Sequence, residues 1–339
     1  MRRDCPSYNI DTLCRLFGNS RQAYYERTRY VCVKKTQEEV ILSLVADVRK
    51  DFPRMGTRKM LIFLASKFEA MGLHIGRDAF FDLLVLCTKY AVLNQKNLLV
   101  RIPRKRRKTT YSDHWMHKYP NLIIGFTPDA PNRLWVCDIT YVDIEGGSSY
   151  LFLITDAYSH VCCAKCKHKI VGWCLAKTLQ ASGALAALRM ALKDQKGSLT
   201  GLIHHSDRGS QYLYCVRSTR YCCGIYVNML TRHKIQISMT QNGNPRENAI
   251  AERINGILKT EWIYGKKPCS WKETIAFVGK IIDLYNNQRP HSSISYMTPA
   301  QIHQTGAKTE RKWKNYYLYC VRSTRYSKKK VSNDNNDVE

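Results

Sequence analysis

Three carboxylates stand at positions in the sequence where they could act together on a metal ion. Asp138 interrupts the apolar stretch LWVCDITYV, Asp207 closes the apolar stretch TGLIHHSD, and Glu252 lies in the helix-like segment NAIAERINGILK. A carboxylate in the middle of an apolar strand is costly to bury without a partner, and a bound metal ion would balance its charge. Structural ion pairing is the alternative, and for each residue taken alone it is the simpler explanation.

The elements that must position these residues begin near residue 131, where the apolar pattern changes from helical spacing to alternation. LWVCDITYVDI and YLFLITDAY are predicted to form a β-hairpin around the turn EGGSS. The elements predicted to follow are a strand at KIVGWCL, a helix over LAKTLQASGALAALRMALKD, a strand at TGLIHHSD, a helix, a strand at KIQISM and a helix over NPRENAIAERINGILKTEWI. This order predicts an α/β fold of the ribonuclease-H-like type, a mixed five-stranded sheet flanked by helices.

Within this order the three carboxylates can converge. Asp138 lies mid-strand, on the face opposite its apolar neighbours, and Asp207 ends the fourth strand at the sheet edge. Glu252 shares a helix face with Asn248, one turn earlier, and with Lys259, two turns later. For Asn248 the simplest role is a helix cap.

Upstream of the sheet, from Glu38 to about Val100, apolar residues recur at helical spacing and predict an all-α bundle of short helices. The basic residues at one helix start, Arg54, Arg58 and Lys59, suit a helix-turn-helix that reads DNA. A helical dimerisation or packing domain is the alternative. The basic run RIPRKRRKTT follows and is predicted to be a linker that lies along the phosphates of DNA. Its candidate DNA-binding residues are Arg104, Arg106 and Arg107.

The charge balance favours nucleic acid as a partner. The chain carries 54 Lys and Arg against 27 Asp and Glu, which gives a formal charge of +27. The positive charges repel one another, and a bound polyanion would relieve that repulsion. A basic protein with another role, such as a ribosomal one, is the alternative. The sequence has no run of eighteen apolar residues and no secretory signal at its N-terminus, so a cytoplasmic protein without a membrane segment is predicted.

One cysteine-rich segment invites comparison with zinc sites. It holds His160, Cys162, Cys163, Cys166 and His168. The spacing matches no common zinc module, and the segment is expected in a crowded hairpin loop. Zinc is therefore not expected, and the fourteen cysteines are predicted to be thiols.

Six blocks, taken in order, resemble the signature blocks of the OrfB-type DDE transposases of the insertion-sequence-three family, whose cores are similar to retroviral integrases. The blocks are WVCDITYV, YLFLITDAYS, IVGW, HHSDRGSQY, NAIAERINGILKTE and YNNQRPHSSISYMTP. The upstream segments PRMGTRKM and TTYSDHWMHKYPNLI resemble that family too. The resemblance covers nearly the whole chain.

The resemblance implies a catalytic and metal-binding triad of Asp138, Asp207 and Glu252. It further implies DNA cleavage and strand transfer by a two-metal mechanism with Mg²⁺, for which Mn²⁺ can substitute. Asp138 would bridge the two ions, while Asp207 and Glu252 would each complete one. Lys259 and Arg208 are the expected DNA contacts beside the triad.

The resemblance also implies partners and a domain division. The expected partners are the terminal inverted repeats and target DNA, further copies of the chain in a homo-oligomer, and an upstream OrfA-type protein, all in the bacterial cytosol or nucleoid. The predicted parts are a short N-terminal helical segment (1–34), a helix-turn-helix-like DNA-binding domain (35–100), a basic linker (101–130), a ribonuclease-H-like integrase catalytic core (131–300) and a basic tail (301–339).

A ten-residue string, YLYCVRSTRY, occurs at 212–221 and again at 317–326. Between Asp207 and Glu252 lie 44 residues, nine more than the thirty-five of the family. Removing Leu213 to Tyr221 restores that spacing and selects Glu252 over Glu247 and Glu261. The string is therefore interpreted as an insert made by in-frame copying, and HVCCAKCK, between DAYS and KIVGW, as another.

The inserts leave a second function open. They lie near the third strand and the second Asp, so the alternative is a catalytically inactive, DNA-binding transposase remnant. A generic ribonuclease H shares the fold but has no need of the N-terminal helices.

Overall fold

The computed structural model describes residues 9–90, 119–158, 168–193, 195, 199–207, 220–241 and 248–305. The chain divides into two compact units. The first is drawn from Met1–Tyr111, Tyr141–Ser149 and Ile254–Pro290, and the second from Ser112–Thr140, Tyr150–Arg253 and His291–Glu339. The five-part division predicted from the sequence stays a prediction.

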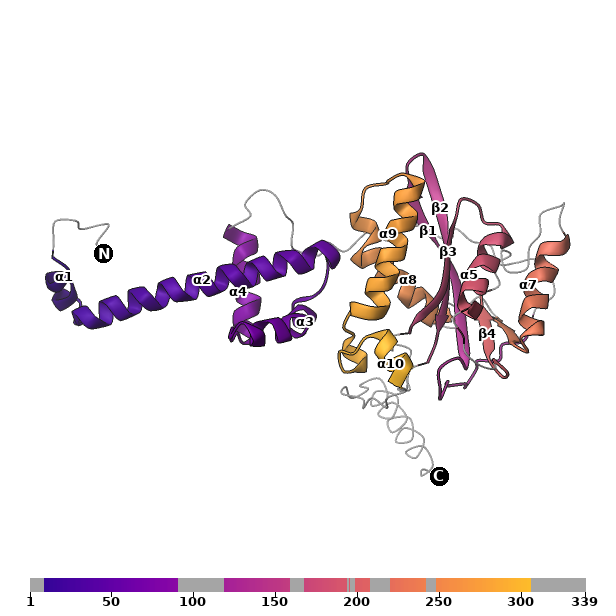
Figure 1. Cartoon of the computed structure of the whole chain (residues 1–339), viewed down its shortest axis with the longest axis horizontal. Helices are drawn as coiled ribbons and strands as arrows, with labels where there is room; N and C mark the ends of the chain where they lie inside the picture. The colour runs from indigo at the N-terminus through magenta and orange to yellow at the C-terminus, as the bar shows by residue number, and fades with distance from the viewer. Residues whose placement is uncertain are drawn as a thin grey trace, which may run out of the picture. The chain divides into compact units, whose positions relative to one another are not determined.

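Helices make up the described N-terminal residues: α1 (Ile10–Leu16), α2 (Arg21–Asp51), α3 (Thr57–Ala70) and α4 (Arg77–Tyr90) (Figure 1). Ser20 caps α2 because its hydroxyl accepts the amide of Ala23. α3 buries Met60, Leu64 and Phe68, which recur every four residues on one helical face. The predicted all-α region is present, and α2 continues without a break across residue 34.

The sheet contains the five strands that the alternation predicts: β1 (Leu134–Ile144), β2 (Gly147–Asp156), β3 (Ile170–Ala176), β4 (Ile203–Ser206) and β5 (Gln236–Met239). Their order is β3-β2-β1-β4-β5. β2 pairs with β3 in antiparallel fashion, whereas β4 runs parallel to both β1 and β5. The mixed ribonuclease-H-like sheet is thereby confirmed.

Helices follow the third strand much as predicted. They are α5 (Ala181–Lys193), α7 (Arg220–Arg232), α8 (Ala249–Glu261), the short η2 (Ile263–Gly265), α9 (Trp271–Asp283), the π-turn η3 (Leu284–Gln288), η4 (Ser292–Ile294) and α10 (Pro299–Thr305). α5 begins later than predicted, because Leu175 and Ala176 remain paired with β2. α9 begins with a capping box, in which Ser270 and Glu273 bond each other's backbone amides.

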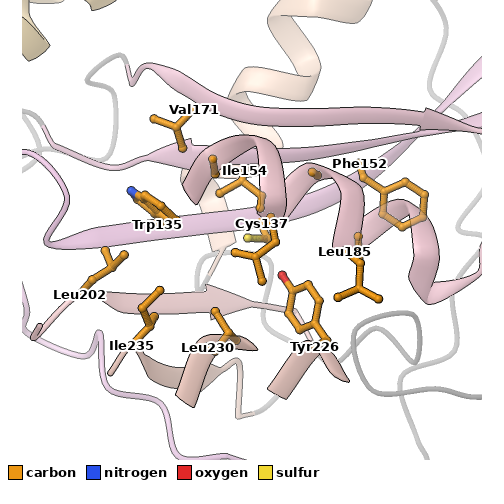
Figure 2. Close-up of a cluster of buried hydrophobic side chains, with 14 of the residues drawn as sticks. Trp135, Cys137, Phe152, Ile154, Val171, Leu185, Leu202, Tyr226, Leu230 and Ile235 are labelled. Carbon is orange, nitrogen blue, oxygen red and sulfur yellow. The ribbon is translucent and has the colours of Figure 1, made fainter. Parts of the chain in front are cut away.

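The main core lies between the sheet and helices α5 and α7. Figure 2 shows Trp135, Phe152, Leu185 and Leu230 among its buried side chains. The packing against α5 is so close that a Cβ on Gly172 would lie 2.2 Å from the Ala187 carbonyl oxygen. Only glycine allows β3 and α5 to approach in this way.

A smaller core lies on the other face of β1. It joins Leu134 and Val136 to Ala157, to Ile203 of β4 and to Ala251 of α8. Alternate residues of β1 therefore face α8, and the next residue in that series after Val136 is Asp138.

The prediction of a chain without a membrane segment can be compared with the described helices. None of them is both long and apolar enough to cross a bilayer.

Candidate active site

The register of two parallel strands places two of the predicted carboxylates side by side. Leu134 of β1 lies opposite Ile203 of β4, and the last pair in this register is Cys137 and Ser206. One residue further along each strand are Asp138 and Asp207. Because side chains in register on parallel neighbours point to the same face, both carboxylates emerge on the α8 side, Asp138 in the middle of β1 and Asp207 directly after β4.

Asp138 is held by its own strand. Its Oδ1 accepts the backbone amide of Ile139 at 2.8 Å, and the residue is partly buried. A carboxylate that accepts a backbone amide has a restricted orientation and is stabilised in its charged form. The strand therefore presents this group in one preferred direction.

Glu252 comes to the same place on the first turn of α8, one residue after the buried Ala251. The start of this helix is tied to β1 by Asn248, whose side-chain amide donates to the Cys137 carbonyl at 3.0 Å. Asn248 is buried, and its contact lies directly beside Asp138. The residue thus links helix and strand across 111 positions of sequence, a role beyond the cap that the sequence suggests.

The electrostatics of the site link Glu252 to Asp207. Glu252 is exposed on the surface of α8, but the partial shielding of its carboxyl group from water raises its pKa above the ordinary value, and the charge of Asp207 raises it further. Burial also raises the pKa of the Cys137 thiol, with added contributions from Asp138 and Asp207. Like charges that raise a pKa are repelling each other, and a cation between them would relieve that repulsion.

The ligand atoms of the candidate site are of a chemical type that binds divalent cations. They are carboxylate oxygens in the middle of β1, directly after β4 and on α8, the hard ligands that Mg²⁺ and Mn²⁺ prefer. Among the described residues, however, no three His, Cys, Asp or Glu side chains gather into a ready-made metal-binding group. The carboxylates are near enough to interact through their charges without already forming a closed ligand set.

A fourth carboxylate of the sheet has a different role. Asp156, at the end of β2, is fully buried and accepts the amides of Asn132 at 2.7 Å and Tyr158 at 2.8 Å. His303 of α10 also contacts it, with 2.9 Å between Nε2 and Oδ2. These partners satisfy the carboxylate, so Asp156 organises the loops around β2 and α10.

Behind the carboxylates, a buried polar network joins β1, β4 and α7. Nε2 of His204 lies 2.9 Å from the Cys137 sulfur and 2.8 Å from the Tyr226 hydroxyl. All three residues are buried, and Figure 2 shows Cys137 and Tyr226 among the side chains of the main core. The network fixes α7 against the strand that carries Asp138.

The buried histidines make the stability depend on pH. Burial lowers the pKa of His168 and of His204 from 6.5 to about 4, so the unfolded chain binds protons that the folded chain does not. The free energy of unfolding should therefore fall as the pH drops from 6.5 toward about 4, by on the order of 3 kcal/mol for each histidine. Urea unfolding across this window measures the slope.

A matched pair of variants isolates the histidine contribution to that slope. His168→Gln should flatten the dependence, whereas the same change at His74, which is exposed, should leave it as in the original chain. An identical slope in both variants would contradict the assignment.

The other predicted DNA contacts are distributed unevenly over the structure. Lys259 lies in the last turn of α8 and Arg58 is exposed at the start of α3. Arg54 and Lys59 are partly buried. Outside the described residues lie Arg104, Arg106, Arg107 and Arg208.

The predicted inserts lie mostly outside the described residues as well. Of the first decapeptide, Arg220 and Tyr221 form the start of α7, and nothing of the second copy is described. Of the zinc candidates, His168 is described and is buried, and the other four are not.

Two family models, each described as an integrase core domain, match residues 128–245 and 233–299. Together these ranges include Asp138, Asp207 and Glu252.

Similar proteins come from bacterial insertion elements. The 31 kDa protein of insertion element IS600 from Shigella sonnei is 33% identical over 299 residues, which cover 86% of this chain and 97% of the relative. The transposase assigned to insertion sequence element IS986/IS6110 of Mycobacterium tuberculosis strain H37Ra is 33% identical over 222 residues, 64% of this chain and 74% of the relative. Transposase InsF for insertion sequence IS3A of Escherichia coli K12 is 27% identical over 301 residues, 87% and 94% of the respective chains.

Proposed function

The chain belongs to the IS3-type family of integrase-like transposases, and from this premise we propose that Asp138, Asp207 and Glu252 are its catalytic residues. The enzyme class is that of polynucleotidyl transferases, which move DNA by phosphoryl transfer. The proposed reaction is cleavage at the ends of an insertion sequence followed by transfer of the freed strands to target DNA.

The observation that carries the proposal is the convergence of the three carboxylates. The β1 and β4 register brings Asp138 and Asp207 side by side on one face of the sheet, and the raised pKa of Glu252 has the charge of Asp207 among its causes. Three acids gathered on a chain of net charge +27 are explained by a cation that needs them.

Asp138, Asp207 and Glu252 would hold a pair of Mg²⁺ ions. When bound, such a pair activates water or a 3′-hydroxyl and stabilises the leaving oxygen of an in-line displacement.

The chain's own residues prepare this site. The Ile139 amide orients Asp138, and Asn248 holds the start of α8 against the backbone beside it. Glu252 retains its proton to a higher pH than an ordinary carboxyl, because of burial and of Asp207. Cation binding should therefore strengthen as the pH rises through the range in which Glu252 ionises.

DNA is the proposed partner of the basic surface. Lys259 lies seven residues after Glu252, about two helical turns along the same face of α8, where it can contact a phosphate next to the reacting bond. Assembly of several copies on DNA and pairing with an upstream OrfA-type protein belong to the same proposal.

Magnesium-dependent nicking and strand transfer on a labelled duplex with the element's own end tests this function. The full chain, with the insert Leu213 to Tyr221 in place, is expected to form product. In support, Tyr226 and Leu230 of α7, the helix that begins within the last two residues of the first insert, are buried in the main core.

The same assay separates the active enzyme from the inactive remnant. No product from the original chain, with activity regained on deletion of Leu213 to Tyr221, would identify a transposase silenced by the insertion. No product from either chain, with DNA binding intact, would identify a remnant that only binds DNA.

A further inference from the structure

We propose that the segment Asp51–Lys59, named here the α8 latch, caps the catalytic helix and holds it in position. Arg54 and Lys59 then act as positioning residues rather than as DNA contacts. This inference rests on the proposed function only where cleavage is the readout.

Arg54 supplies the cap. A helix leaves its last four carbonyls without intrahelical partners, and one of these in α8 is that of Thr260. The Arg54 guanidinium donates to this oxygen at 2.8 Å. A cation at the C-terminus of a helix also interacts favourably with the helix dipole. The guanidinium lies close to η2 as well, since a Cβ on Gly265 would be 3.7 Å from it.

The end of α2 provides a second attachment. The indole Nε1 of Trp262, the residue after α8, donates to the Asp51 carbonyl at 2.7 Å. The Phe52 ring is 98% buried and packs 6.0 Å from the Trp262 ring. The Asp51 carboxylate pairs with Lys280 of α9 at 2.6 Å. These contacts join residues more than 200 positions apart.

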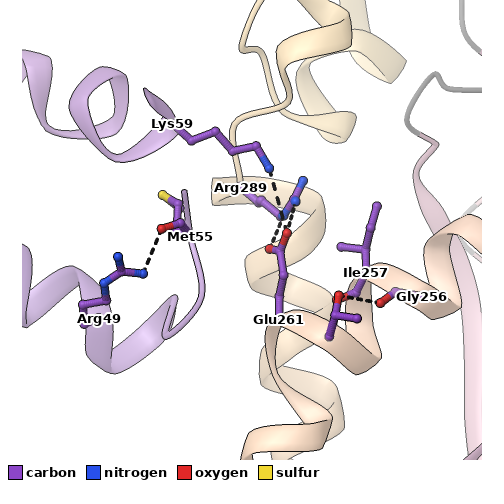
Figure 3. A network of polar contacts seen from close by, with 8 residues as sticks. Arg49, Met55, Lys59, Gly256, Ile257, Glu261 and Arg289 are labelled. Carbon is purple, nitrogen blue, oxygen red and sulfur yellow. Dashed lines mark hydrogen bonds and ion pairs between the residues drawn. The ribbon is translucent and has the colours of Figure 1, made fainter. Parts of the chain in front are cut away.

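An ion pair network completes the latch (Figure 3). The Glu261 carboxylate binds the buried guanidinium of Arg289, with 2.6 Å between Oε2 and Nε. The ammonium group of Lys59 lies 3.9 Å from the other oxygen of Glu261. Because Arg289 is almost entirely removed from water, the Glu261 charge is needed to balance it.

The latch has a preformed shape. Arg49 of α2 donates to the carbonyls of Pro53 at 3.0 Å and Met55 at 2.8 Å, and Figure 3 shows the second of these bonds. Met55 is buried, and Pro53 restricts the backbone between the two helices. The turn from α2 to α3 thus presents Arg54 toward α8 in a defined conformation.

The helix that receives these contacts is the one that carries Glu252. Glu252 and Glu261 are nine residues apart, about two and a half turns, so they lie on opposite faces of α8. One face presents a carboxylate to the candidate active site, and the other is held by the latch. Fraying of the C-terminal turn of α8 would loosen the support of Glu252, and small displacements of a reacting group reduce rates strongly.

The first test measures hydrogen exchange at the amides of the last turn of α8 and of η2 in the full chain. Arg54→Met keeps the aliphatic stem and removes the donor, so these amides should exchange on the order of tenfold faster. Arg58→Met is the matched control, because Arg58 is exposed in the first turn of α3, four residues after Arg54, and it should leave their exchange unchanged. Unchanged exchange in Arg54→Met would overturn the latch.

A charge exchange gives a second, independent test. Asp51→Lys and Lys280→Asp should each speed exchange in α8 and α9, and the double variant should recover protection because the pair is restored with reversed signs. A double variant that is no better protected than the single variants would contradict the attachment.

Cleavage and DNA affinity then distinguish this inference from the proposed function. Arg54→Met should nick DNA about tenfold more slowly with DNA affinity unchanged, whereas Arg58→Met should lose affinity. A chain that never nicks DNA would refute the proposed function and leave the exchange result intact. Equal losses of affinity in both variants, with normal exchange, would make Arg54 a DNA contact.

Discussion

Replacing Glu252 by glutamine is expected to abolish magnesium-dependent nicking, with a loss on the order of 10³-fold or more, equivalent to about 4 kcal/mol of activation free energy. The amide has nearly the same size but carries no charge, so it is a poor ligand for a hard divalent cation. The structure of α8 should be preserved, because Glu252 is an exposed residue of its first turn. Single-turnover nicking of an end-containing duplex measures the effect.

The matched control for this variant is Glu247→Gln, which changes the glutamate five residues earlier in the sequence. It should retain cleavage, because the family spacing selects Glu252. DNA affinity, followed by fluorescence anisotropy, should be nearly equal in both variants. Full activity in Glu252→Gln would show that another residue supplies the third carboxylate.

DNA binding is expected to weaken steeply with salt. A chain with a formal charge of +27 binds phosphates by releasing condensed counterions, and each phosphate contact adds to the slope. With about six to ten such contacts, the affinity should fall by about 10³ to 10⁵ between about 50 and about 200 mM salt. Titration of a labelled duplex at several salt concentrations gives the slope directly.

Substitutions of single basic residues measure how much each one contributes to this salt dependence. Lys259→Met and Arg58→Met should each reduce its magnitude by about one, while Arg54→Met should not, because that guanidinium is engaged by Thr260. The triple change at Arg104, Arg106 and Arg107 tests the basic run. A flat salt profile would argue against the basic surface as the DNA site.

The sheet could be predicted from the sequence because its signals are local. Alternation in LWVCDITYVDI and YLFLITDAY identifies β1 and β2, and the turn between them places Gly146 at a φ of +80°, which glycine readily adopts. The order of strands and helices then restricts the topology to few arrangements. The placement of Asp138 and Asp207 side by side on adjacent parallel strands follows from that topology.

The supports of the site could not be predicted, because they depend on contacts between distant segments. Asn248 reads locally as a helix cap, yet it bonds the Cys137 carbonyl. His204 and Tyr226 look like ordinary apolar-segment residues until β4 and α7 are packed together. Each of these contacts requires the tertiary structure, for which neither residue type nor spacing carries a signal.

The N-terminal helices illustrate the same distinction. Their periodicity predicts an all-α region, and basic residues at a helix start suggest DNA reading. In the structure, Arg54 contacts Thr260 and Lys59 contacts Glu261. A positive charge in the sequence does not reveal whether its partner is a phosphate or a carbonyl of the same chain.

Holding α8 from its far end has a thermodynamic consequence. Coupling free energies between two sites are reciprocal. If cations bound by Glu252 stabilise α8, they must also strengthen the attachment of Asp51–Lys59 to that helix. The attachment must in turn strengthen cation binding, and the two factors are equal. If the N-terminal helices bind the DNA ends of the insertion sequence, that binding would be coupled to the same equilibrium. Metal binding would then change the affinity for the DNA ends, and binding of the DNA ends would change the affinity for the metal.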